Sequence, residues 1–466
     1  MQHPLSAIKT QIMKLIMTTL CFISLIFNAT LNAQAWQTQH PNFPNKTTPY
    51  EVICPNTTDA WTFGFEYDSS FTSFSQVNYT LSRTTDSGQT WESITFPHTE
   101  PGYFSSLSAL NGDVAWISYV DYAEGNKVLK TTDGGLNWTQ LPIYVGGWIN
   151  LAHFFDENTG VVMGDPDSLG FEIYTTIDGG ESWTRVDNNS IPSSMPDEYA
   201  YAGFYEVVGS EIWFESTAGR VFHSPDYGNT WNVINGPLPM PYFLMAVDDT
   251  KTVYMGYSMS DNPDGSDPLT SLYRSADNGI SWEDITPADN GWWIFDIEPV
   301  PGTNTIVASL NAGFATGLFE TWISYDRGSS WTSIDNSAHT LVIDFADAQT
   351  GFAGKWQMPD DVSPTLIYNY IGSPLTSLLD PKPLAIDLLV TPNPTSDFIN
   401  INVTATVPDQ YLILLNDING KLVYRSENVL DGAWTKDINI TSLPSGTYTL
   451  TIATSKGVRT ESIVKL

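Results

Sequence analysis

The sequence is poor in cysteine, histidine and basic residues. Its 466 residues include 2 cysteines, 6 histidines and 19 Lys and Arg, against 52 Asp and Glu. Because Cys21 falls in an N-terminal export segment described below, Cys54 has no partner for an intramolecular disulfide, and stability must come from an apolar core. The scattered histidines form no zinc-type cluster. Neither a P-loop nor a Gly-x-Ser-x-Gly motif is present, so those nucleotide-binding and hydrolase classes have no support.

The shortage of basic residues is concentrated in one part of the chain. Residues 35–379 hold 43 Asp and Glu against 10 Lys and Arg, and the whole chain has a formal net charge of −33. Such a surface repels phosphate backbones, so nucleic acid is excluded as a partner, whereas cations and basic proteins remain open.

The only long apolar run lies at the N-terminus. Lys9 and Lys14 precede the apolar segment LIMTTLCFISLIF (15–27), and small residues follow in AQA (33–35). This order predicts a signal peptide over residues 1–35 and no transmembrane segment after its cleavage.

One short motif, Ser/Thr-x-Asp-x-Gly-x-x-Trp, occurs six times. Its aspartates are spaced by 47, 45, 48, 51 and 49 residues, a period typical of repeat folds rather than of scattered catalytic motifs. The Asp carboxylate can accept backbone N–H bonds, the Gly permits positive φ and the Trp supplies an apolar plug, so we expect a structural turn. Its members are Asp86, Gly88 and Trp91; Asp133, Gly135 and Trp138; Asp178, Gly180 and Trp183; Asp226, Gly228 and Trp231; Asp277, Gly279 and Trp282; Asp326, Gly328 and Trp331.

Four short β-rich segments per period predict an all-β, seven-bladed β-propeller over residues 36–372. Six blades contain the motif between their third and fourth strands. The segment TLIYNY (365–370) ends a seventh blade that lacks a fourth strand, and AWQTQHPNFP (35–44) matches the segment that follows each motif. We therefore expect Trp36 to Gln39 to complete the last blade beside residues 366–370 and to close the ring.

The repeated motif resembles the BNR or Asp-box repeat of sialidases, sortilin-type receptors and photosystem assembly-factor propellers. The resemblance implies that the motif is a structural turn away from the binding face, and it names no activity. Sialidase-like enzymes grip a carboxylate with three arginines. Four of the five arginines in residues 35–379 lie next to or within a motif, and only Arg220 remains. Sialidase activity is therefore not expected.

The loops opposite the motifs are longer and combine aromatic and acidic residues. Such a face suits stacking on sugars or holding an extended peptide, although aromatics at these positions can also pack between blades. The candidate ligand-binding residues are Trp148, Tyr201, Trp292, Trp293, Asp165, Asp197 and Asp289. A weaker candidate for a Ca²⁺ site is DNPDGSD (261–267), through Asp261, Asp264 and Asp267, and no other cofactor is indicated.

After a Pro-containing linker (373–388), residues 389–466 contain short strands and hairpin turns typical of a small β-sandwich. The segments VTPNPTSDFININV (390–403), LNDINGKLVY (415–424), LPSGTYTLTI (443–452) and ESIVKL (461–466) resemble the type A C-terminal sorting domain of type IX secretion. The resemblance implies a bacterium of the Bacteroidota, the type IX machinery as a partner, and a product that is released or attached to the outer surface.

The sequence therefore predicts an exported propeller that binds an extracellular glycan or protein. Two alternatives stay open: a glycoside hydrolase that acts from the loop-rich face, and a scaffold for the assembly of another complex. A carboxylate pair facing the centre of the ring would favour the enzyme.

Overall fold

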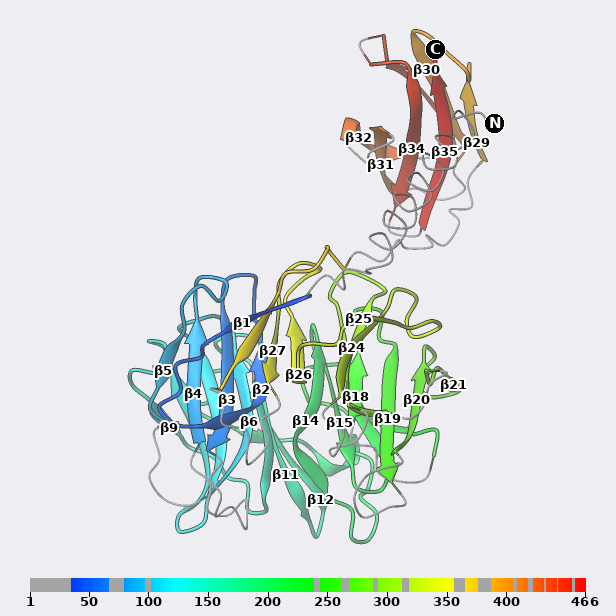
Figure 1. The fold of residues 1–466 in the computed structure, drawn as a ribbon. Coiled ribbons are helices and arrows are strands. Elements are labelled where there is room, and N and C mark those ends of the chain that lie inside the picture. Colours follow the sequence, from blue (N-terminus) through cyan, green and yellow to red (C-terminus); the bar gives the residue numbers. More distant parts are fainter. Residues whose placement is uncertain are drawn as a thin grey trace, which may run out of the picture. The chain divides into compact units, whose positions relative to one another are not determined.

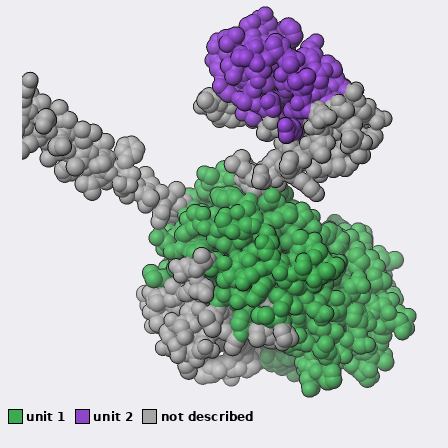
Figure 2. Space-filling view, turned by 90° about the vertical axis from the view of Figure 1, so that its right-hand side faces the viewer, with its two compact units in different colours: residues 1–375 green, residues 376–466 purple. Residues whose placement is uncertain are grey.

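The structure is a computed structural model, and it divides the chain into residues 1–375 and 376–466 (Figure 2). It describes residues 35–466 except 67–78, 97–101, 239–243, 261–267, 288–291, 312–317, 356–364, 376–386, 405–408, 418–421, 431–432, 442 and 455–456. The predicted signal peptide lies outside these residues, apart from Ala35. Among the described residues, no helix combines the length and the apolar character needed to span a bilayer.

The first unit is a β-propeller that contains seven four-stranded antiparallel sheets (Figure 1), the number of blades that the repeats predict. We number the sheets in chain order. Sheet 1 consists of β2 (Thr47–Ile53), β3 (Ala60–Glu66), β4 (Tyr79–Thr84) and β5 (Glu92–Ile94). Sheet 2 consists of β6 (Gly102–Ala109), β7 (Ala115–Asp121), β8 (Gly125–Thr131) and β9 (Thr139–Leu141). Sheet 3 consists of β10 (Ile149–Phe154), β11 (Gly160–Asp167), β12 (Gly170–Thr176) and β13 (Thr184–Arg185).

Sheets 4 to 6 repeat the same order. Sheet 4 consists of β14 (Ala200–Val208), β15 (Glu211–Ser216), β16 (Arg220–Ser224) and β17 (Asn232–Asn235). Sheet 5 consists of β18 (Leu244–Val247), β19 (Val253–Ser260), β20 (Pro268–Ser275) and β21 (Glu283–Asp284). Sheet 6 consists of β22 (Trp293–Pro299), β23 (Ile306–Asn311), β24 (Phe319–Ser324) and β25 (Thr332–Asp335).

Sheet 7 joins the two ends of the unit. It consists of β26 (Thr340–Phe345), β27 (Gly351–Lys355), β28 (Ile367–Tyr370) and, at its outer edge, β1 (Trp36–Gln39). The register places Trp36 opposite Tyr370 and Gln39 opposite Ile367, which confirms the predicted pairing. The N-terminal strand therefore supplies the strand that the C-terminal part of the repeat lacks.

The apolar core lies between the sheets. Seven clusters of buried side chains each join two consecutive sheets, and one of them joins sheet 7 to sheet 1 through Phe352, Ile367, Val52 and Trp91. Each sheet is thus covered on both faces by its neighbours, and the ring is closed by side-chain packing as well as by β1.

The six repeated motifs form one hydrogen-bonded turn. In the first, the Thr84 hydroxyl donates to Asp86 Oδ1 at 2.8 Å and accepts from the Gly88 N–H at 3.0 Å, while the Thr90 N–H and hydroxyl donate to Asp86 at 2.8 and 2.6 Å. The motifs of Asp133, Asp178, Asp226, Asp277 and Asp326 repeat these bonds, except that in the Asp133 motif the Asn137 amide donates in place of the hydroxyl. The geometry is that of a structural turn.

Glycine and tryptophan tie each turn to the rest of the ring. Gly180 has φ +92°, and a Cβ there would lie 2.6 Å from Leu141 Cδ1 of the preceding sheet, so both conformation and packing require glycine. Trp91 and Trp231 are buried, whereas the other four motif tryptophans are half-buried. Trp282 and Trp331 donate their indole N–H to Asn235 O and Ile285 O of the preceding sheets.

The second unit contains two sheets around its own core. One sheet has the order β29 (Asp387–Thr391), β30 (Phe398–Thr404) and β33 (Ala433–Asn439). The other has the order β32 (Leu422–Leu430), β31 (Asp409–Asp417), β34 (Gly446–Thr454) and β35 (Gly457–Lys465). Ile401, Ile413, Leu450 and Ile463 are fully buried between them, as expected for a β-sandwich.

Candidate functional site

The two faces of the propeller are set by its topology. In each up-and-down sheet, the motif turn and the turn between the first two strands lie at one end, and we call this the box face. The turns between second and third strands, and the connections to the next sheet, lie at the other end, which we call the loop face. We therefore looked for ligand-binding side chains on the loop face, where the structural turns do not occupy the surface.

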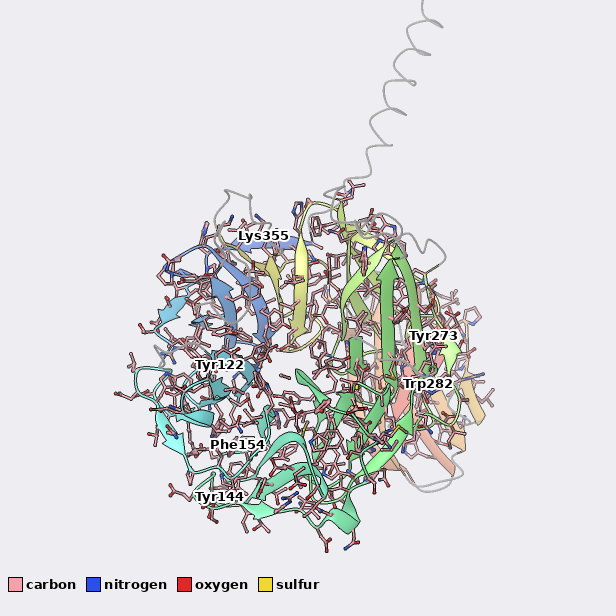
Figure 3. All side chains as sticks on the ribbon, turned by 90° about the horizontal axis from the view of Figure 1, so that it is seen from below. Tyr122, Tyr144, Phe154, Tyr273, Trp282 and Lys355 are labelled. Atoms are coloured by element: carbon pink, nitrogen blue, oxygen red, sulfur yellow. The ribbon has the colours of Figure 1, made fainter. Side chains whose placement is uncertain are left out.

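Aromatic side chains line the loop-face side of sheets 1 to 3. Tyr50, Tyr103, Tyr122, Tyr144 and Trp148, which we call the aromatic arc, come from these three sheets and their connections. The Trp148 ring lies 5.5 Å from that of Tyr103 and 6.3 Å from that of Tyr122, between centroids. Tyr50 is 41% exposed, Tyr122 47% and Tyr144 62%. Figure 3 places Tyr122 nearer the middle of the ring and Tyr144 nearer its rim.

Two of these phenols have raised pKa values. Desolvation by the surrounding side chains raises the pKa of the partly exposed Tyr50, and the phenol of Tyr103 in the next sheet adds to the shift. Desolvation also raises the pKa of Tyr103, with a further contribution from Tyr122. Since the ordinary pKa of tyrosine is about 10, both rings are neutral at physiological pH.

A short connection, residues 142–148, presents two members of the arc and is held by polar contacts. Glu172 accepts from the N–H groups of Gly146 and Gly147 at 2.8 and 2.7 Å. The Asn126 amide donates to Val145 O at 2.9 Å and to Gly147 O at 2.5 Å. Because these contacts fix the backbone before any ligand arrives, less conformational entropy is lost on binding.

Asp165 lies beside Trp148, as the sequence predicts. Its N–H donates to the Trp148 carbonyl at 2.9 Å, and its Oδ1 accepts from the Asn150 amide at 2.8 Å. Burial raises the pKa of Asp165. Asp167 lies two residues further along β11. The Arg185 guanidinium donates a hydrogen bond to Asp167 at 2.9 Å and lowers the pKa of that carboxyl. Two nearby acids thus have their pKa values shifted in opposite directions.

The other predicted binding residues have more varied surroundings. Tyr201 is half-buried, with its ring 5.8 Å from that of Phe204, and Asp197 is exposed at φ +60°. The loop that carries Asp197 is organised by its neighbour Glu198, which accepts from the Ser216 hydroxyl at 2.5 Å and pairs with the Arg220 guanidinium. The backbone of Ala200 also bonds to Asp165, so this loop adjoins the Trp148 region.

The two tryptophans of sheet 6 do not form a common surface with the arc. Trp292 packs against the core between sheets 5 and 6, with its ring 6.3 Å from that of Trp322, and Trp293 pairs with Asn311 within the sheet. Trp148 packs in the same way against the core between sheets 2 and 3, and it differs from Trp292 in lying beside the exposed ring of Tyr122. Asp289 and the suggested Ca²⁺ ligands Asp261, Asp264 and Asp267 lie outside the described residues. In the described part of the chain, no group of three or more His, Cys, Asp or Glu side chains could hold a metal ion.

A second group of residues was missed from the sequence. In six sheets, one residue of the first strand pairs with the equivalent position of the second strand. These residues are Ser108, His153, Glu206, Ala246, Glu298 and Asp344. Glu51 and Asp296 lie two residues before this position in their strands. Figure 1 shows β2, β6, β14 and β26 near the middle of the ring, and eight of the nine residues of β14 are half-buried, so these strands border the ring axis.

We call Glu51, Glu206, Asp296, Glu298 and Asp344 the axial cluster. Desolvation raises the pKa of all five, to about 8 for Glu51, about 7 for Asp296 and about 6 for Asp344, and neighbouring acids add to the shift of Glu51, Glu206, Asp296 and Glu298. The Glu298 and Asp344 side chains are hydrogen-bonded to each other. No local motif marks these residues; only an alignment of the seven repeats by strand register would have brought them together.

Comparison with known proteins separates the two units. Residues 389–466 match the family described as "Secretion system C-terminal sorting domain". The chain carries a secretion-system sorting domain. This domain is the β-sandwich of the second unit, and it directs export through type IX secretion to the cell surface or the extracellular space. The expected localisation is thereby confirmed.

The chain also resembles parts of larger curated proteins. A "Xyloglucanase" of Hypocrea jecorina (strain QM6a) is 27% identical over 280 residues, which cover 56% of this chain and 30% of that protein. A "Xyloglucanase" of Paenibacillus sp is 25% identical over 318 residues, which cover 63% of this chain and 28% of that protein. The chain thus spans less than a third of the length of these relatives.

A solved structure supports the fold of the first unit. The chain titled "YCF48 bound to D1 peptide" superposes with a TM-score of 0.52 at 19% identity, covering 74% of this chain and 97% of that one. At this identity the likeness bears on the fold alone, and it agrees with a propeller.

Proposed function

We propose that the protein is an exported propeller that binds an extracellular polysaccharide of the xyloglucan class on its loop face. The observation that carries the proposal is the aromatic arc, in which Trp148 lies next to Tyr103 and the exposed Tyr122, and the same three sheets also carry the exposed rings of Tyr50 and Tyr144. The sequence likeness to parts of two xyloglucanases supports a ligand of this class.

The chemistry of the arc suits an uncharged polysaccharide. Tyrosine and tryptophan rings stack on the apolar C–H faces of sugars, while phenols and carboxylates bond to hydroxyl groups. The formal charge of −33 neither attracts nor repels a neutral glycan, whereas it disfavours an anionic one. The anchored connection at residues 142–148 keeps Tyr144 and Trp148 in place.

Isothermal titration calorimetry with soluble xyloglucan tests the proposal. Trp148→Ala and Tyr122→Ala should each weaken binding by about 1–3 kcal/mol, the usual cost of removing an aromatic anchor. Tyr325→Ala is the matched control, because Tyr325 is 44% exposed and belongs to a motif turn on the box face. Equal affinity in all four proteins would reject the arc as the binding surface.

Hydrolysis of the same glycan is the second candidate, and one observation favours it. Asp165 and Asp167 stand two residues apart in β11 beside Trp148, and a pair of carboxyl groups is the catalytic equipment of most glycoside hydrolases. If this candidate holds, Asp165→Asn abolishes the release of reducing ends from xyloglucan but retains binding. If the wild-type protein binds xyloglucan but releases no reducing ends, the hydrolysis candidate is rejected and the binding function remains.

A further inference from the structure

The first strand of sheet 4 is more irregular than the first strands of sheets 1, 2, 3 and 6. In β14 the pairing with β15 is interrupted between Ala200 and Tyr205, so that residues 201–204 stand opposite the single residue Glu215. At the same place, the other four strands each have one unpaired residue, namely Tyr50, Ser105, Asn150 and Phe295. Added residues make a strand bulge out of its sheet. We call residues 200–205, with the sequence AYAGFY, the strap.

The strap reaches sheet 2 across the first strand of sheet 3. Sheets 2 and 4 both flank sheet 3 through β6, β10 and β14, yet β14 also contacts β6 directly. The Tyr205 hydroxyl donates to the Leu107 carbonyl of β6 at 3.2 Å, and the Tyr205 ring lies 5.7 Å from that of His153 in β10, between centroids. The strap is therefore tied to sheet 2 and packs on sheet 3 where it crosses.

Gly203 allows the backbones of sheets 4 and 2 to approach each other closely. It has φ +80°, and a Cβ at this position would lie 2.8 Å from the carbonyl oxygen of Ser105 in β6. Both the conformation and the available space therefore require glycine. Ser105 is buried and is the unpaired residue of its own strand, so the strap lies directly on the irregularity of sheet 2.

The strap runs beside two rings of the aromatic arc. At its start, the Asp165 carboxylate accepts from its first N–H, and the N–H of Asp165 donates to the Trp148 carbonyl. At its other end it lies on Ser105, two residues after Tyr103, whose ring is 5.5 Å from that of Trp148. Because β11 pairs with the outer edge of β10, the strap crosses β10 on the side of the ring axis, where Figure 1 shows β6 and β14.

We propose that the strap is the inner wall of the glycan site and keeps the ligand on the aromatic arc. This inference rests on the proposed function. The half-buried rings of Tyr201 and Phe204, 5.8 Å apart, give the wall an apolar character that suits the C–H faces of a sugar chain. A chain stacked on Trp148 and Tyr103 meets the strap on the axial side, so it runs outwards along the arc towards Tyr144, which Figure 3 places near the rim.

Gly203 and Tyr205 are then positioning residues, which act on the ligand through the strap. Their contacts with sheet 2 fix the wall before a ligand arrives, so less conformational entropy is lost on binding. Displacement of the strap would also withdraw the N–H that Asp165 accepts and would loosen the backbone next to Trp148. We therefore expect changes at these two residues to alter glycan affinity although neither contacts the glycan.

Two variants displace the strap by different means. Gly203→Val places a branched side chain against the Ser105 carbonyl, whereas Tyr205→Phe keeps the ring and removes the donor to Leu107. Gly209→Val is the matched control. Gly209 follows β14 at its other end and also has a positive φ, +63°, but a Cβ there would meet open space. The control therefore contains the backbone strain without the collision.

Cleavage of the full-length folded protein by chymotrypsin reports on the strap without any ligand. Tyr201 and Phe204 are aromatic cleavage sites, and a protease needs a locally released backbone to cut there. Cleavage between residues 200 and 205, followed by mass spectrometry, should be slow in the wild type and in Gly209→Val. It should be about tenfold or more faster in Gly203→Val, and Tyr205→Phe should lie between them.

Calorimetric titration with soluble xyloglucan, at equal folded fraction, reports on the wall. Gly209→Val should bind as the wild type does, Gly203→Val about fivefold or more weakly, and Tyr205→Phe about two- to tenfold more weakly for the loss of one hydrogen bond. In a Trp148→Ala background, Gly203→Val should cause a smaller loss than it does alone, because both act on one site. A purely structural role would change the melting temperature and leave these affinities unchanged.

Three results would overturn the inference. Equal affinity in Gly203→Val and Gly209→Val, with faster cleavage in the former, would reject the wall and leave the proposed binding function in place. Unchanged cleavage in both Gly203→Val and Tyr205→Phe would show that these contacts do not fix the strap. A wild-type protein that does not bind xyloglucan would reject the proposed function, and the role of the strap with it. If Gly203→Val does not fold, Gly203→Ala is held to the same criteria.

Discussion

Trp36 and Tyr370 lie opposite each other in strands β1 and β28, although they stand at the two ends of the propeller sequence. The Trp36 indole is fully buried, bonds to the Thr321 hydroxyl at 3.0 Å and lies 5.4 Å from the Tyr370 ring. Asp335 of sheet 6 accepts from the N–H groups of Ala35 and Trp36 at 2.9 and 3.3 Å. A short N-terminal strand is thus held by its backbone, its side chain and the neighbouring sheet.

Removal of the Trp36 side chain should therefore destabilise the whole ring. We expect Trp36→Ala to lower the free energy of unfolding by about 3–5 kcal/mol, as is usual for a buried tryptophan. Thr38→Ala, at an exposed position of the same strand, should change it by less than about 0.5 kcal/mol. Urea unfolding followed by tryptophan fluorescence measures both, and equal values for the two variants would contradict ring closure by β1.

The motif turns should affect stability without affecting binding. Asp178→Ala leaves the hydroxyl and N–H of Ser182 without their acceptor, so the melting temperature should fall. Glu181→Ala changes an exposed residue of the same turn and serves as the control. Affinity for xyloglucan should be the same in both variants. A loss of affinity in Asp178→Ala at unchanged melting temperature would instead give the motif a direct role in binding.

The same turns predict the acid limit of stability. Bonds from Ser182 lower the pKa of Asp178 to about 2, and the pKa values of Asp86, Asp133, Asp277 and Asp326 are also lowered. An acid with a lowered pKa stabilises the fold above its ordinary pKa of about 4, and this contribution is lost as the pH falls through its folded value.

The melting temperature should therefore fall between about pH 4 and pH 2, and this fall should be smaller in Asp178→Asn than in the wild type. A melting temperature that stays constant from pH 4 down to pH 2, or the same decline in Asp178→Asn and the wild type, would contradict the assignment.

The sorting domain should be separable from the propeller. Its core residues Ile401, Ile413, Leu450 and Ile463 pack within the second unit, and sheet 7 closes the ring without it. Deletion of residues 376–466 should leave a folded propeller that stays inside the cell envelope. Fractionation of cells that express the truncated and the full chain compares the two, and arrival of the truncated chain at the cell surface or in the medium would refute the dependence on the domain.

Much of the fold could be predicted because the repeat makes local signals reinforce one another. Six copies of one turn reveal the period, and the match of residues 35–44 to the segments after each motif predicts that Trp36 meets the strand before Tyr370. The aspartate of the turn was identified as a hydrogen-bond acceptor from its residue type and its neighbours alone.

The sites were harder to predict because they combine residues from different repeats. Trp148 and Asp165 could be paired, since both lie at the loop-face ends of the adjacent strands β10 and β11, but Tyr122 meets Trp148 only through the spatial order of the sheets. Trp292 and Trp148 have the same kind of sequence surroundings and both pack partly against a core between two sheets, but Trp148 also lies beside the exposed ring of Tyr122. The axial acids stand in ordinary alternating strands, and only their register across the ring brings them together.

The measurement that tests the central claim most directly is the affinity of the full chain for soluble xyloglucan, with Trp148→Ala, Tyr122→Ala and Tyr325→Ala compared at equal folded fraction. We predict that the wild type and Tyr325→Ala bind equally, and that the two loop-face variants bind about 5- to 150-fold more weakly, which corresponds to about 1–3 kcal/mol. A wild-type chain that shows no binding to xyloglucan, or an equal loss in Tyr325→Ala, would contradict the assignment of the aromatic arc as a glycan-binding surface.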